Sequence, residues 1–79
     1  MRFSEINNGD ILKLKEDRRL AYGMSETCIR VRYLKKRLGY KVGWIVTAVP
    51  AGQEGFGPNK DEWYFKPTDF LTRLPDFSN

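Results

Sequence analysis

The pattern of hydrophobic and polar residues is most regular between residues 27 and 49, where it predicts a β-hairpin. Residues 28–34 and 40–49 are both rich in the β-branched and aromatic side chains that strands favour. The segment between them, KKRLG, is short and mostly polar, and it ends in a glycine that is free to take a positive φ. We therefore take this hairpin as the element around which the chain is organised.

The alternation of side chains predicts which residues of the hairpin face the core. Apolar residues alternate with arginines in the first strand and hold the even positions in the second, giving the sets Ile29, Val31 and Tyr33, and Tyr40, Val42, Trp44 and Val46. Pairing Val31 with Trp44 would bury both sets together, whereas a slip of one residue would bury arginines. This register turns Arg30, Arg32 and Lys41 outward, and it places Gly39 at the left-handed position of a loop over 36–39.

Two further strands are predicted from short alternating runs. In residues 10–15, Leu12 and Leu14 alternate with lysines. In residues 62–66, two aromatic residues that share one face, Trp63 and Phe65, point to the core. Phe3 and Ile6 would form a short preceding strand or pack under the open end of a barrel.

The segments between these strands are predicted to be less regular. Residues 16–26 have no clear period and are expected to form a long loop, with a short helix over 17–22 as the competing interpretation. Residues 50–61 hold three glycines and two prolines and are expected to form an exposed excursion. Pro67 should end the strand before it, residues 68–70 should form a single helical turn with Thr68 as its cap, and residues 71–74 should form a last short strand.

This order of elements resembles that of the SH3-like small β-barrels. Three stretches carry the likeness: GDILKL at 9–14, Gly43-Trp44, and FKPTDFL at 65–71. The resemblance implies an all-β domain over residues 1–79, a five-stranded barrel with a core at about 9–74, a 3₁₀ turn before the last strand and a loose tail at 75–79. The wide fold group includes binders of nucleic acid, ribosomes and proteins, so the resemblance leaves the function open. The proline-peptide groove of eukaryotic SH3 domains is not expected. That groove needs several paired aromatic residues, and in this sequence only Trp44 and Tyr22 are candidates for them.

Composition and charge narrow the class of protein. The 79 residues carry a net charge of +4, and ten of the fourteen Lys and Arg lie between residues 13 and 41, against three acids. A surface of that kind attracts phosphate backbones or acidic protein surfaces. The sequence has no apolar run long enough for a membrane span or a signal peptide, and its single cysteine, Cys28, agrees with a reducing cytoplasm.

The residue types argue against catalysis. The chain has no histidine, which removes the commonest general base and metal ligand and leaves Cys28 without an activating partner. No phosphate-binding glycine motif is present, because Gly52, Gly55 and Gly57 lack the Lys-Ser or Lys-Thr that would follow. We therefore expect a non-enzymatic monomer with no cofactor, no metal, no small-molecule substrate and no membrane partner.

The main functional prediction is a basic hairpin that binds nucleic acid through phosphates, with tyrosines able to stack on unpaired bases. Arg18 and Arg19 could approach the same surface from the preceding loop, while Trp44 and Trp63 are more simply explained as core residues. A solvated face that only blocks aggregation is the simpler alternative explanation of the charge. The predicted nucleic-acid site consists of Arg30, Arg32, Lys35, Lys36, Arg37, Tyr40 and Lys41.

A second hypothesis comes from another class of protein. An adaptor or inhibitor, of the kind that viruses encode, could dock on a larger protein through a phenylalanine in the glycine-rich excursion. Its candidate contact residues are Phe56 and Tyr64.

Overall fold

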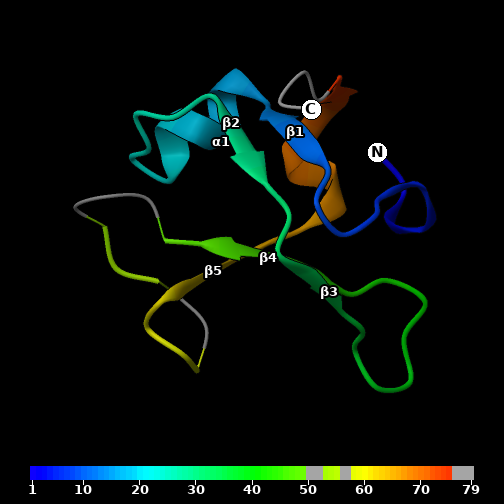
Figure 1. Ribbon diagram of the computed structural model, residues 1–79. Coiled ribbons are helices and arrows are strands. Elements are labelled where there is room, and N and C mark those ends of the chain that lie inside the picture. The colour runs from blue at the N-terminus through cyan, green and yellow to red at the C-terminus, as the bar shows by residue number, and fades with distance from the viewer. Residues whose placement is uncertain (50–52, 56–57, 76–79) are drawn as a thin grey trace.

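The computed structural model describes residues 1–49, 53–55 and 58–75, and it contains six strands in two antiparallel sheets. The first sheet has the order β2-β1-β6 and the second the order β3-β4-β5 (Figure 1). The strands are β1 (Ile11–Leu14), β2 (Cys28–Arg30), β3 (Tyr33–Lys35), β4 (Trp44–Ala48), β5 (Glu62–Phe65) and β6 (Phe70–Leu74). The all-β class is confirmed, but the predicted five-stranded closed barrel is wrong, because the described strands form two separate sheets.

The sixth strand arises because the first predicted hairpin strand is divided in two. β2 pairs with β1 in one sheet, whereas β3 pairs with β4 in the other, so the chain changes sheet at Val31 and Arg32. The Val31 amide donates to the Asp10 carbonyl of the first sheet at 2.8 Å, and the Arg32 amide donates to the Val46 carbonyl of the second, also at 2.8 Å. These two adjacent residues therefore tie the sheets together.

The change of sheet overturns the predicted register of the hairpin. Tyr33 pairs with Val46 and Lys35 pairs with Trp44. The predicted partner of Trp44 is Val31, so the register differs from the prediction by four residues. The connecting loop consequently spans residues 36–43 rather than 36–39. Gly39 nevertheless has the predicted left-handed conformation, with φ of +78°.

The core lies between the two sheets and is built from both. Ile29 and Val31 face it as predicted, as do Leu12 and Leu14 of β1, and Trp63 and Phe65 of β5. In the second sheet the alternation places Leu34 and Ile45 toward this core, with Thr47 on the same side of β4. The buried cluster consists of Ile6, Leu12, Leu14, Met24, Ile29, Val31, Ile45, Trp63, Phe65 and Phe70.

Short helices close the ends of this core. Residues predicted as a long loop instead form α1 (Glu16–Ala21), which corresponds to the competing interpretation. Glu16 and Asp17 lie in its first turn, where acidic side chains favour a helix, and Arg19 bonds back to Glu16. The N-terminal segment forms η1 (Phe3–Glu5), a 3₁₀ helix rather than a strand, and it leads to Ile6, which is buried.

The 3₁₀ turn before the last strand is present as η2 (Pro67–Asp69). It begins one residue earlier than predicted and is not capped by Thr68. Instead Asp69 accepts a hydrogen bond of 2.9 Å from the Lys66 amide. Among the described residues no helix is long and apolar enough to cross a bilayer. The expected loose tail lies mostly at 76–79, outside the described residues, as does much of the predicted excursion at 50–61.

Candidate nucleic-acid interface

The loop between β3 and β4, residues 36–43, carries most of the predicted site and projects from the second sheet (Figure 1). The Tyr40 amide donates to the Arg37 carbonyl at 3.1 Å, and Gly39 follows the left-handed path between them. Gly43 is buried where the loop returns, and a Cβ there would lie 2.3 Å from the Lys35 carbonyl oxygen. We call residues 36–43 the basic loop; all of them except Gly43 are exposed.

The outward side of the second sheet presents aromatic side chains. Because Tyr33 and Tyr64 both lie opposite Val46, and Trp44 is two residues from Val46, all three rings project on the side away from the core. The Trp44 and Tyr64 ring centroids are 6.2 Å apart, and both side chains are half-buried. We call Tyr33, Trp44 and Tyr64 the outer face.

Cations lie over two rings of the outer face and over Tyr40 of the basic loop. The Lys35 ammonium is 5.5 Å from the centroid of Tyr64. The Arg37 guanidinium carbon is 4.3 Å from the centroid of Tyr40 and 5.9 Å from that of Trp44. Cation–π contacts of this kind hold the long side chains near the sheet. Basic and aromatic groups therefore alternate over the outer face and the start of the basic loop.

One carboxylate shares this side of the sheet. The Tyr33 hydroxyl donates a hydrogen bond to Glu62, which pairs with Ala48 at the far end of β4 and β5 and is itself buried. This hydrogen bond, with some burial, raises the pKa of Tyr33 well above its usual value. The tyrosine thus shields the negative charge of Glu62 at the opposite end of the sheet from the basic loop.

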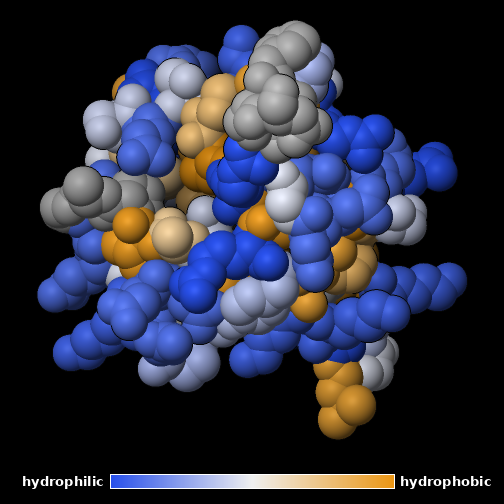
Figure 2. Space-filling view, viewed as in Figure 1, coloured by the Kyte–Doolittle hydropathy of each residue, from blue (hydrophilic) through white to orange (hydrophobic). Residues whose placement is uncertain are grey.

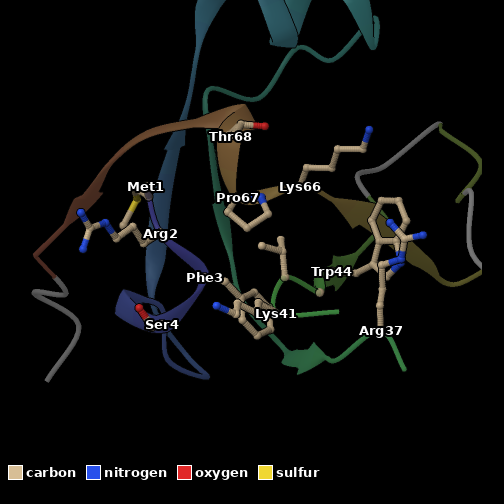
Figure 3. A pocket seen from close by; sticks show the side chains of 12 residues that line it. Met1, Arg2, Phe3, Ser4, Arg37, Lys41, Trp44, Lys66, Pro67 and Thr68 are labelled. Atoms are coloured by element: carbon tan, nitrogen blue, oxygen red, sulfur yellow. The ribbon is translucent and has the colours of Figure 1, made fainter. Parts of the chain in front are cut away.

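A cavity of about 700 Å³ opens beside Trp44, where the basic loop meets η1 and η2 (Figure 3). Arg37 and Lys41 of the basic loop line it, together with Phe3 and Pro67. We call it the Trp44 cavity. It joins the outer face through Trp44, which belongs to both.

The structure brings together only part of the predicted site. Lys35, Lys36, Arg37, Tyr40 and Lys41 belong to one end of the second sheet and its loop, as predicted. Arg30 and Arg32 do not join them, because they line a separate, smaller hollow between β2 and β4. The Arg30 guanidinium there donates to the Gly9 carbonyl at 2.9 Å.

Arg18 and Arg19 do not extend the basic loop either. The Arg19 guanidinium donates hydrogen bonds to the Glu16 carboxylate at 2.5 Å and to the Met24 carbonyl at 2.8 Å. The bond to Glu16 holds the pKa of that carboxylate below its usual value. The Arg18 Nε lies 3.7 Å from the Asp69 carboxylate. Both arginines therefore stabilise α1 and its junction with η2.

Only one of the two candidate contact residues of the adaptor hypothesis, Tyr64, lies among the described residues. Phe56 lies outside the described residues. Tyr64 is on the outer face beside Trp44.

Hydrophilic side chains cover most of the view in Figure 2, with smaller apolar patches between them.

Trp44 is the main residue of the candidate site that the sequence interpretation assigned to the core instead. The run WIVTAV at 44–49 is apolar at both odd and even positions, so its own pattern does not decide which face is buried. The neighbouring strand is less ambiguous, because Trp63 and Phe65 flank Tyr64. Pairing β4 with β5 would have placed Ile45 inside and Trp44 outside. Nothing in the sequence pattern indicates that Phe3 or Pro67 would line a cavity.

Comparison with known protein families, with curated proteins and with solved structures finds no match to this chain. Within the part of the chain that the structure describes, no three acidic or cysteine side chains gather in a way that could hold a metal ion. The candidate function therefore rests on the geometry of the outer face and the basic loop.

Proposed function

We propose that this chain is a non-enzymatic, cytoplasmic protein that binds nucleic acid with its outer face and basic loop. The observation that carries the proposal is the interleaving of cations and rings: Lys35 over Tyr64, and Arg37 over Tyr40 and Trp44. Cations meet phosphates, while exposed rings stack on bases without strong sequence preference. Binding would thus depend on salt more than on sequence.

The strand order is consistent with the resemblance to SH3-like proteins, which we retain as a proposal. β2 and β3 would correspond to two halves of one bent strand, and η2 precedes the last strand as in that group. The fold group includes nucleic-acid binders as well as protein binders, so it permits the proposed function without deciding it.

A salt series with a labelled, mixed-sequence oligonucleotide tests the proposal. Four cations of this region, Lys35, Lys36, Arg37 and Lys41, predict a log–log slope of roughly −3 to −4 on a duplex and of about −3 on a single strand if each meets one phosphate. The double variant Lys35→Glu, Lys36→Glu should bind at least tenfold more weakly while it remains folded. Neither residue lines the Trp44 cavity.

The matched control is the double variant Lys13→Glu, Lys60→Glu. It changes the net charge by the same amount at two exposed lysines, one on β1 of the first sheet and one in the turn before β5. Its affinity should fall threefold or less. Equal losses in both variants would mean that only net charge matters, and no binding at low salt would reject the proposal.

A further inference from the structure

The Trp44 cavity combines an apolar interior with a basic rim. Its apolar side chains come from three separate parts of the chain: Met1 and Phe3 at the N-terminus, Val42 of the basic loop with Trp44 at the start of β4, and Pro67 of η2. In Figure 3, Phe3, Pro67 and Trp44 surround the opening. A volume of about 700 Å³ lies within the range of pockets that hold small organic ligands.

The charges around the cavity all have the same sign. Its lining includes Arg2, Arg37, Lys41 and Lys66 and, among the described residues, no carboxylate. Lys41 and Phe3 overlap in the view of Figure 3, in which Lys66 extends on the side of Trp44 and Arg2 points away from the opening. A ligand that matches this cavity has a flat or apolar body and more than one negative charge outside it.

We propose that the Trp44 cavity receives an unpaired base of single-stranded nucleic acid, with the flanking phosphates on Arg37, Lys41 and Lys66. This inference rests on the proposed function and adds to it the class of strand. Trp44 lines the cavity and supplies a ring for the base to contact, and Arg37, whose guanidinium carbon is 5.9 Å from the centroid of that ring, supplies a cation close to the base's own phosphate.

Single strands are favoured over duplexes because the bases of a duplex are already stacked and paired. A base must leave its stack to enter a pocket, and that step costs free energy in a duplex. Contact with phosphates alone carries no such cost and would not distinguish the two forms. Preference for single strands therefore measures contact with unpaired bases, while salt dependence measures contact with phosphates. A cavity variant is then needed to assign the base contact to the cavity rather than to the exposed rings.

An acidic peptide with an aromatic residue has related chemistry, but the geometry favours the nucleic acid. The cavity is continuous with the outer face through Trp44, and cations recur along this surface at Lys35, Lys36 and Arg37. The repeating phosphates of a nucleic acid can contact each cation of such a series. An acidic peptide with one aromatic side chain in the cavity would need only the cations at its rim.

Two single strands of equal length provide the test: one of mixed sequence, and one in which every nucleotide is abasic. Both carry the same phosphates, so only the bases differ. The mixed strand should bind at least tenfold more tightly than the abasic strand and than the matching duplex, since each stacked base contributes a factor of this order. Binding should also quench tryptophan fluorescence with the mixed strand only.

Two variants of the basic loop locate the effect. Val42→Glu places a carboxylate in the cavity, whereas Leu38→Glu makes the same kind of change at a residue that is 99% exposed and does not line it. Val42→Glu should bind the mixed strand no better than the abasic one. Leu38→Glu should weaken both strands equally, by threefold or less.

The outcomes separate the two proposals. If the abasic strand binds as tightly as the mixed strand, with the expected salt slope, nucleic-acid binding through phosphates stands, while the base-binding cavity and base stacking on the exposed rings are rejected. If neither strand binds at low salt, both proposals fail. If an acidic aromatic peptide binds more tightly than the mixed strand and loses affinity in Val42→Glu, the cavity is a protein-binding site and this inference is overturned.

Discussion

The Tyr22 hydroxyl donates a hydrogen bond of 2.8 Å to the Asp69 carboxylate, joining the end of α1 to η2 across 47 positions of the sequence. Asp69 is only 2% exposed, and the same carboxylate oxygen accepts the Lys66 amide at 2.9 Å. The contact fixes the turn that carries Lys66 and Pro67, both of which line the Trp44 cavity.

Removing the carboxylate should therefore destabilise the fold. We expect Asp69→Ala to lower the free energy of unfolding by about 2–4 kcal/mol, because it leaves two donors without their acceptor. Tyr22→Phe should cost about 1 kcal/mol, since it removes only one of the two bonds. Urea denaturation measures both. Asp61→Ala, at an exposed aspartate, is the control, and a loss there as large as that of Asp69→Ala would contradict the assignment.

The same hydrogen bond predicts a dependence on alkaline pH. Burial, and then the bond to Asp69, raises the pKa of Tyr22 to about 12. An unfolded tyrosine titrates near 10, so the contribution of Tyr22 is fully present below about pH 10 and is lost as the pH rises through 12. The difference in unfolding free energy between the wild type and Tyr22→Phe should be constant from pH 7 to 9 and should shrink by pH 11.5. If the difference in unfolding free energy instead grows between pH 9 and 11.5, the predicted direction of the pH dependence is wrong.

Gly43 should be intolerant of a side chain. A Cβ at this position would lie 2.3 Å from the Lys35 carbonyl oxygen and 2.8 Å from the Lys36 Cα, both of which are backbone atoms. We expect Gly43→Ala to cost about 1–3 kcal/mol, as overpacking does, and to displace Trp44. The indole N–H resonance of Trp44 in a two-dimensional NMR spectrum reports that displacement.

Gly39→Ala is the matched control for this prediction. Gly39 has φ of +78° and open space around its Cα, so alanine there costs about 1–2 kcal/mol from backbone strain alone. The Trp44 indole resonance should stay in place. A shift of equal size in both variants would show that loop strain, rather than the close approach at Gly43, positions the tryptophan.

Tyr33→Phe should destabilise the protein at the end of the outer face that lies away from the basic loop. The variant leaves the buried Glu62 carboxylate without the phenol that bonds to it, so we expect the melting temperature to fall by a few degrees. Adding Glu62→Gln should restore much of the loss, because the neutral amide carries no unpaired charge. Additive losses in the double variant would show that the two residues act independently.

Local patterns in the sequence are enough to predict those parts of the fold that lie within a single strand or turn. The alternation of Leu12 and Leu14 with lysines, and of Trp63 and Phe65 around Tyr64, places these residues correctly because each lies in one short strand of one sheet. Gly39 is likewise predictable, since only a turn needs its positive φ. The clustering of basic residues in 35–41 follows from the sequence directly.

The orientation of Trp44, by contrast, depends on how the two sheets are arranged in space. The period-two argument assumes one continuous strand, but the chain leaves the first sheet at Val31 and enters the second at Tyr33, which resets the faces and the register. Trp44 consequently turns outward while Ile45 takes its place in the core. Phe3 and Pro67 meet it only because η1 and η2, far apart in the sequence, close the same end of the molecule. Local patterns carry no information about such long-range contacts, so only the three-dimensional structure could reveal the cavity.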